Sequence, residues 1–212
     1  MKRNNFLSLV AIIGIVFVAL IGCGQLSTDH TTGSKLPTDQ TDQTIHYKTY
    51  VNQRFGFSVQ YPSTWEIGSR PTNGDGRYFS TPSNVSSFDN GYSSGVSKAD
   101  VLLLAVGTTN AVMGVGQGYD FKQMVTVFKK FFATERKAPG VVSESYTIIP
   151  NKWIIDTSIQ RMGQNGMQYS KTFTNLETNQ SISLMLPVSQ ADKYELIYKH
   201  IAASFKPGNR PG

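Results

Sequence analysis

Apolar and polar residues alternate with a period of two along much of the chain after residue 45. This period puts successive side chains on opposite faces of an extended strand, so it predicts β-strands. The expected strands are 46–51, 55–61, 65–67, 101–106, 141–149, 153–160, 167–175 and 180–186, with 77–80 as a further candidate. Because the later strands follow one another through short turns, the pattern favours an antiparallel sheet.

Two amphipathic helices are expected between and after these strands. The first runs from Asp120 to Lys137, where Asp120 and Gln123 have the spacing of a capping box and Pro139-Gly140 marks the end. Its apolar face consists of Phe121, Met124, Val125, Phe128, Phe131 and Phe132. The second runs from Gln190 to Ser204, and its apolar stripe consists of Tyr194, Ile197, Tyr198, Ile201 and Phe205. Together the elements predict an α+β fold of one domain, an antiparallel β-sheet flanked by helices.

The N-terminal part of the chain has a different character. Lys2 and Arg3 precede a largely apolar run of 17 residues, Phe6 to Gly22, which ends at Cys23, the sole cysteine. A positive start, a short apolar run and a small residue at its end are typical of a secretory signal peptide. An uncleaved membrane helix is an alternative, although the run is short for the roughly 20 residues that a span needs. An ordinary secretory signal with an incidental cysteine is another.

The segment Leu20-Ile21-Gly22-Cys23 resembles the lipobox of bacterial lipoproteins. The resemblance implies a lipoprotein signal peptide over residues 1–22, cleaved between Gly22 and Cys23. It also implies that Cys23 carries diacylglycerol and that acyl chains such as palmitate anchor the mature chain in the cell membrane, on its extracytoplasmic face. Gly24 stands where an aspartate would mark inner-membrane retention in Gram-negative lipoproteins, so that mark is missing.

A polar stretch separates Cys23 from the first expected strand. Residues 26–44 are rich in Thr, Asp and Gln and contain almost no apolar residue, which predicts a flexible tether over residues 23–45. Some twenty flexible residues span about 25 Å on average, so the domain can reach the bilayer. The folded domain is expected over residues 46–207, with a disordered tail over 208–212. A domain of about 160 residues needs neither a disulfide nor a metal for stability.

Two segments, YVNQRFGFSVQYPSTWEI at 50–67 and YKHIAASFKP at 198–207, resemble the PsbP-like fold. That family includes extrinsic subunits of the photosynthetic oxygen-evolving complex, bacterial lipoproteins and a eukaryotic Ran-binding factor. The resemblance implies an α-β-α sandwich, and it implies a non-catalytic binding or assembly module, since members with known roles act through partners. Its motif residues, Gly56-Phe57, Tyr61-Pro62 and Trp65, are expected to pack the core. The metal and photosystem contacts of PsbP have no matching motif here.

Two fragments have the spacing of catalytic or cofactor motifs. Gly91-Tyr-Ser93-Ser-Gly95 fits a nucleophile elbow, and Asp156 and His200 follow in the chain order of a hydrolase triad. Both flanks of Ser93 are turn-like, so an envelope serine hydrolase is the less favoured alternative. The glycine-rich segment 114–118 precedes a helix as a phosphate loop would, but Asp120 would repel a phosphate there. The chain is therefore expected not to be an enzyme.

Composition argues against several other classes. The three histidines, His30, His46 and His200, are far apart in sequence, and only one cysteine is present. Such a set does not form a conventional ligand cluster, so neither a metal site nor a cofactor is expected. Cleavage would remove Lys2 and Arg3 and lower the net charge from +6 to +4. That charge and an extracytoplasmic location argue against a nucleic-acid partner.

Two candidate surfaces remain. Basic residues lie opposite the phenylalanine face of the first helix, and this candidate membrane-facing stripe consists of Lys122, Lys129, Lys130, Arg136 and Lys137. Each charge near an anionic bilayer contributes about 1 kcal/mol, although an ordinary solvated helix face is the simpler interpretation.

The second surface is the Gly- and Ser-rich segment 70–97, whose candidate partner-binding aromatics are Tyr78, Phe79, Phe88 and Tyr92. A loop that folds back on its own sheet explains them equally well. With either surface, the sequence predicts a membrane-anchored lipoprotein that binds an envelope protein partner. A lipoprotein holding a small ligand between sheet and helix is the alternative.

Overall fold

The computed structural model describes residues 44–71, 74–82, 101–110, 118–163 and 166–208. The chain divides into two units, Met1–Ile45 and His46–Gly212, and every described helix and strand belongs to the second. In chain order the elements are β1 (Tyr47–Val51), β2 (Ser58–Pro62), β3 (Glu66–Ile67), β4 (Asp75–Ser80), β5 (Leu102–Thr109), α1 (Phe121–Glu135), β6 (Val141–Ile149), η2 (Pro150–Lys152), β7 (Ile154–Met162), β8 (Met167–Thr174), β9 (Thr178–Leu186), η3 (Val188–Gln190) and α2 (Ala191–Ser204).

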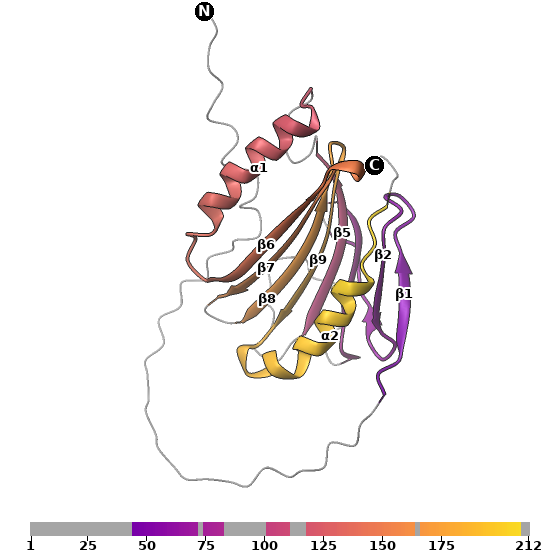
Figure 1. Cartoon of the computed structure of the whole chain (residues 1–212). Coiled ribbons are helices and arrows are strands. Elements are labelled where there is room, and N and C mark those ends of the chain that lie inside the picture. The colour runs from indigo at the N-terminus through magenta and orange to yellow at the C-terminus, as the bar shows by residue number, and fades with distance from the viewer. Residues whose placement is uncertain (1–43, 72–73, 83–100, 111–117, 164–165, 209–212) are drawn as a thin grey trace, which may run out of the picture. The chain divides into compact units, whose positions relative to one another are not determined.

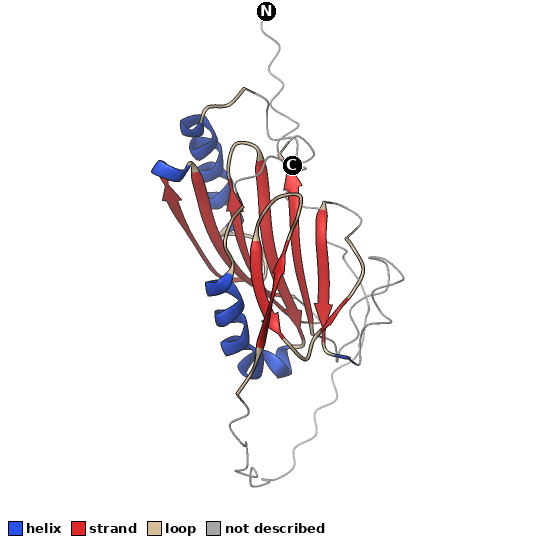
Figure 2. Cartoon of the chain, turned by 90° about the vertical axis from the view of Figure 1, so that its right-hand side faces the viewer, coloured by secondary structure: helices blue, strands red, loops and turns tan. Residues whose placement is uncertain are grey.

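The strands form two antiparallel sheets. β1 and β2 make a two-stranded hairpin, and the others make a seven-stranded sheet in the order β3-β4-β5-β9-β8-β7-β6. Figure 1 shows the part of this order from β5 through β9, β8 and β7 to β6, and in Figure 2 the strands rotate progressively across the sheet, as the handed twist of β-strands requires. The antiparallel sheet expected from the sequence is confirmed. β4 begins two residues before the candidate strand 77–80, at Asp75.

The two helices lie on opposite faces of the large sheet. Tyr146 of β6 pairs with Thr157 of β7, whereas Tyr169 of β8 pairs with Gln160 of β7. Thr157 and Gln160 are three residues apart in one strand, so the two tyrosines point to opposite faces. α1 packs on the Tyr146 face and α2 on the Tyr169 face, with ring centroids 4.9 Å apart for Phe132–Tyr146 and 5.0 Å apart for Tyr169–Tyr198. The predicted α+β class, a sheet flanked by helices on both sides, is confirmed.

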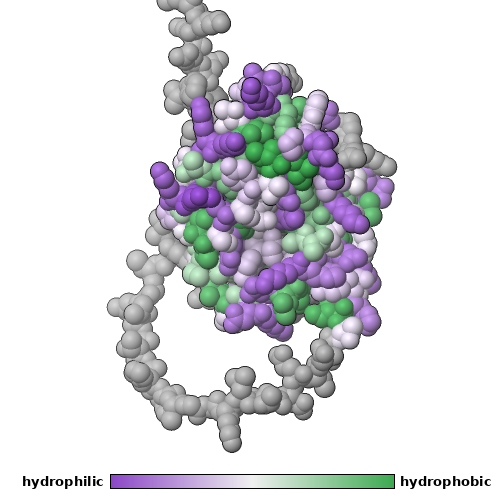
Figure 3. All heavy atoms as spheres, viewed as in Figure 1, coloured by the Kyte–Doolittle hydropathy of each residue, from purple (hydrophilic) through white to green (hydrophobic). Residues whose placement is uncertain are grey.

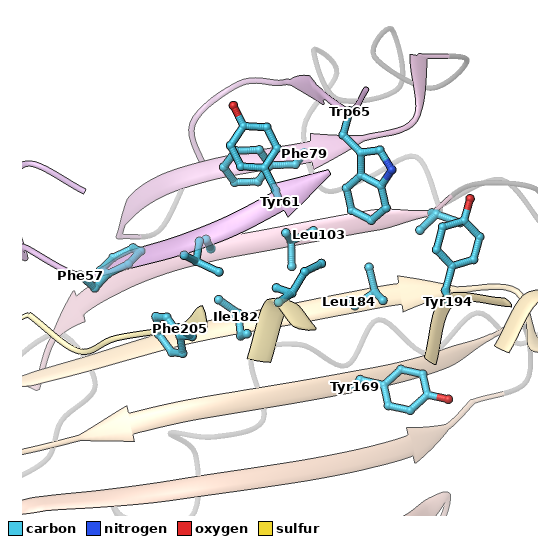
Figure 4. Packing of buried hydrophobic residues seen from close by; sticks show 14 of the residues in the cluster. Phe57, Tyr61, Trp65, Phe79, Leu103, Tyr169, Ile182, Leu184, Tyr194 and Phe205 are labelled. Atoms are coloured by element: carbon cyan, nitrogen blue, oxygen red, sulfur yellow. The ribbon is translucent and has the colours of Figure 1, made fainter. Parts of the chain in front are cut away.

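The main core lies between the large sheet, the β1–β2 hairpin and α2. Figure 4 shows aromatic side chains of β2 and β4 gathered beside aliphatic side chains of β5 and β9. Phe57 is fully buried, and Tyr61 and Trp65 are 5% and 6% exposed, which confirms that these motif residues pack the core. Trp65 and Tyr194 of α2 lie toward each other, with ring centroids 6.2 Å apart.

α1 begins after Asp120, as its sequence predicts, and ends at Glu135, two residues before the expected end at Lys137. The Gln123 N–H donates to Asp120 Oδ1 at 2.7 Å, and the Asp120 N–H donates to Gln123 Oε1 at 2.9 Å, which completes the capping box. After the helix, Gly140 has a φ of +81°, a conformation that favours glycine. The capping box therefore fixes where the helix starts, and Gly140 turns the chain into β6.

The end of the domain extends one residue beyond the expected boundary at Pro207. Gly208 is buried, its N–H donates to Gln180 Oε1 at 2.8 Å, and its carbonyl accepts from Gln180 Nε2 at 3.1 Å. Gln180 lies in β9 and is only 1% exposed. One side-chain amide thus satisfies both backbone groups of Gly208, and Gly208 belongs to the folded domain rather than to the tail.

Replacing Gln180 with alanine should lower the free energy of unfolding by about 3 kcal/mol, because two buried backbone groups of Gly208 lose their partner. Urea unfolding followed by circular dichroism measures the change. Gln168→Ala is the matched control, since Gln168 is half-buried and its amide donates to Ser170 Oγ at 3.2 Å. Equal losses in the two variants would contradict a specific role for Gln180.

Candidate functional site

The basic stripe predicted on the first helix lies on the outer side of α1. Lys122, Lys129 and Lys130 are exposed, as are Arg136 and Lys137, which follow the last helical turn. Figure 3 shows hydrophilic side chains projecting where α1 lies in the view of Figure 1. The apolar side of the helix faces inward, with Met124 and Phe132 only 4% and 3% exposed. The helix therefore separates a phenylalanine-rich inner face from a basic outer face.

Two acidic residues near this helix, Glu135 and Glu144, are held in inward contacts. Glu135 forms an ion pair with Arg161 of β7, and the Glu135 side chain is only 15% exposed. Asp120 is held in the capping box at the start of the helix. Arg136 Nε donates to Glu144 Oε1 of β6 at 2.8 Å, and the Glu144 side chain is 3% exposed. Glu135, the one carboxylate within α1 itself, is thus directed away from the outer lysines.

We define the α1 lysine face as the surface formed by four exposed lysines, Lys122, Lys129, Lys130 and Lys137. Among the residues that the structure describes, none of these four lysines forms an ion pair. Arg136 contributes to the same side but shares its charge with Glu144. The α1 lysine face is therefore an exposed surface of one sign, held on the sheet by the ring contacts of Phe128 and Phe132 with Tyr146.

The predicted aromatic surface is wrong for two of its four residues. Tyr78 and Phe79 lie in β4, which pairs with β3 and β5, and they are 9% and 0% exposed. Phe79 packs on Tyr61, with ring centroids 4.5 Å apart. Buried side chains of a strand that is paired on both sides offer no contact area to a partner. Phe88 and Tyr92 lie outside the described residues, as do Gly22, Cys23 and Ser93.

A hydrolase triad with Ser93 would also need Asp156 and His200. In the structure these two residues have different partners. The His200 ring stacks on Tyr47 of β1, with centroids 3.7 Å apart, and His200 Nε2 lies 2.7 Å from Gln60 Oε1 of β2. Asp156 Oδ2 lies 3.4 Å from Lys171 Nζ on β8. The histidine thus contacts the β1–β2 hairpin and the aspartate contacts the large sheet.

A half-buried cluster around Asp156 was not anticipated from the sequence. Burial raises the pKa of this carboxyl, while the ammonium of Lys171 acts to lower it. Asp156 Oδ1 is buried and has no hydrogen-bond partner among the described residues. Burial also raises the pKa of Tyr198 of α2, and the charge of Asp156 adds to this effect. The cluster joins a strand and a helix 42 positions apart, so local sequence patterns could not reveal it.

The stability of the domain should fall at alkaline pH because of Tyr198. Its pKa is raised in the folded state. The stability that the neutral side chain contributes is therefore fully present below about pH 10, the ordinary tyrosine pKa, and is lost as the pH rises toward the folded pKa. Between pH 8 and pH 11, the free energy of unfolding of the Tyr198→Phe variant should therefore fall by about 1 kcal/mol less than that of the wild type. Urea unfolding at both pH values measures this, and identical pH profiles would contradict it.

The space between α2 and the large sheet is filled by side chains. Ile182, Leu184 and Ile201 are fully buried there, and Phe205 stacks on Phe173 with ring centroids 5.0 Å apart. In the described part of the chain, no group of three or more His, Cys, Asp or Glu side chains could hold a metal ion. Within the same part, no helix is both long and apolar enough to cross a membrane.

Comparison with known proteins gives similarity in structure only. No protein-family model matches the chain, and no curated protein matches it. The solution structure of cyanobacterial PsbP (CyanoP) from Synechocystis sp. PCC 6803 is similar at 12% identity and a TM-score of 0.49, over 81% of this chain and 98% of that one. The crystal structure of LpqN, involved in cell envelope biogenesis of Mycobacterium tuberculosis, is similar at 7% identity and a TM-score of 0.46. The similarity covers 79% of this chain and 93% of LpqN. At these values the likenesses carry no statement about the activity of this chain.

Proposed function

We propose that this chain is a lipid-anchored, non-catalytic binding module on the extracytoplasmic face of the cell membrane. The observation that carries the proposal is the α1 lysine face, a one-sign surface on a domain preceded by a lipobox-like segment. An exposed helix face of one charge suits association with another surface better than turnover of a small substrate. The anchor keeps the domain beside the membrane, and the lysines supply the contact.

Two further observations support binding over the alternatives. The packed core beneath α2 favours a structural role for that helix over the small-ligand hypothesis. Asp156 and His200 contact different parts of the fold, which weighs against the hydrolase hypothesis. The outer side of α1 concentrates exposed side chains of one charge.

The proposal is tested by crosslinking in intact cells. A photoreactive residue replaces Lys129 on α1 in the full-length protein, and captured species are identified by mass spectrometry. The matched control places the same residue at Leu196, which is 74% exposed on the outer side of α2. A second probe at Tyr92 tests the candidate loop surface.

We expect an adduct at Lys129, formed with an envelope component, and none of the same species at Leu196. The same adducts at both positions would indicate random collision and would contradict a binding role for α1. Capture at Tyr92 alone would move the binding surface to the loop.

A further inference from the structure

We propose that the α1 lysine face docks the domain on an anionic phospholipid bilayer. This inference rests on the proposed function and names the contact that α1 makes. The occupant is the bilayer surface itself, recognised through the phosphate headgroups of anionic lipids, and not a single bound lipid in a pocket.

The shape of the charged surface favours a flat partner. Lys122 and Lys129 lie two helical turns apart, and Lys130 and Lys137 repeat the same spacing on the neighbouring row. A rise of 1.5 Å per residue spreads these charges along roughly 20 Å of α1 and its C-terminal extension. A line of this length can contact many headgroups at once, whereas a compact anion would touch only one or two lysines.

The chemistry of the side chains agrees with this geometry. Lysine ammonium groups on long flexible stems act as point charges and attract phosphate without demanding a fixed orientation. Arg136, the one group here with a fork-shaped set of donors, has its Nε–H committed to the buried Glu144. The remaining groups favour attraction to a charged surface over recognition of one molecule.

The helix is also held firmly enough to present the charges. Ring contacts of Phe128 and Phe132 with Tyr146 fix its inner side, and the ion pair of Glu135 with Arg161 fixes its last turn. Docking therefore needs no unfolding of the helix. The tether expected between Cys23 and β1 confines the domain near the bilayer, so weak attraction is sufficient to populate the docked state.

The test uses the full-length lipoprotein reconstituted in vesicles. A donor fluorophore on Thr126→Cys, an exposed position between the two lysine rows, reports energy transfer to acceptor-labelled lipid headgroups. The vesicles contain either phosphatidylglycerol mixed with phosphatidylcholine or phosphatidylcholine alone. The same fluorophore on Leu196→Cys reports the outer side of α2.

We expect transfer from position 126 to be clearly higher in anionic vesicles than in neutral ones, because the anchor and tether alone hold the domain about 25 Å from either bilayer on average. Transfer should fall when ionic strength rises from about 0.01 M to about 1 M, because the screening length shrinks from about 30 Å to about 3 Å. Lys129→Gln/Lys130→Gln should lower the ratio of docked to undocked protein by about 25-fold, since each lysine near the bilayer accounts for about fivefold. The control, Lys193→Gln/Lys199→Gln on α2, should leave the ratio unchanged.

Equal transfer from position 126 in anionic and neutral vesicles would overturn the docking inference, as would equal effects of the two double variants. Co-flotation of the protein with the vesicles reports the anchor separately. A protein that floats while position 126 shows no lipid-dependent transfer keeps its anchor and lacks the docking contact. A protein that does not float lacks the anchor. That result would contradict the proposed function, independently of the docking contact.

Discussion

Replacing Phe79 with alanine is expected to lower the free energy of unfolding by about 3 to 5 kcal/mol, enough to unfold a marginally stable domain. The side chain is fully buried in β4, opposite Leu103 of β5, and its ring lies 4.5 Å from that of Tyr61 and 5.4 Å from that of Tyr50. Truncation removes these contacts and leaves a cavity that a sheet cannot easily close.

Urea unfolding measures this loss, and Leu196→Ala is the control because Leu196 is 74% exposed. That control should change the free energy of unfolding by less than about 0.5 kcal/mol. The experiment also separates the two interpretations of Phe79. A variant that keeps its stability and loses only a partner would contradict the burial of β4.

Replacing Cys23 with alanine is expected to abolish lipid attachment completely, because only the thiol at this position can form the thioether. The variant should retain residues 1–22 and migrate as a longer chain, since cleavage of a lipoprotein signal follows lipid transfer. Labelling of growing cells with an alkyne fatty acid, followed by gel electrophoresis, measures both effects.

Ser27→Ala is the control for Cys23→Ala, because it changes a polar residue just beyond the cysteine and should leave label and mobility unchanged. Equal label in the two variants would contradict acylation at Cys23 and favour an ordinary signal or a membrane helix.

Patterns within single elements predicted most of the fold. In β9 every second residue from Thr178 to Leu186 is buried, and the apolar Ile182, Leu184 and Leu186 fall on that buried side. The capping box of α1 was predictable because its two partners are three residues apart. Periodicity and capping depend only on neighbours in sequence, so they can be interpreted without knowledge of the fold.

β4 shows where this kind of prediction fails. Its core residues, Tyr78 and Phe79, are adjacent, so they point to opposite faces and give no alternation that would mark one buried side. The surrounding Gly, Asn and Pro residues favour a loop. Burial follows from pairing with β3 and β5, which the local sequence does not specify.

The charge of the candidate site depended on the tertiary fold in the same way. In sequence, Glu135 stands among basic residues and would moderate their charge. In the fold it pairs with Arg161, which lies 26 residues further along the chain. The row of lysines could be predicted from the heptad spacing. The ion pair that holds Glu135 away from the lysines could not be predicted, because its partner is distant in sequence.

The most direct test of the central claim, a lipid-anchored domain, is the intact mass of the protein extracted from the membranes of cells that produce it. We predict a chain that begins at Cys23, lacks residues 1–22, and carries the added mass of a diacylglycerol on its N-terminal residue. A chain that begins at Met1, or one cleaved elsewhere without added lipid, would contradict the claim.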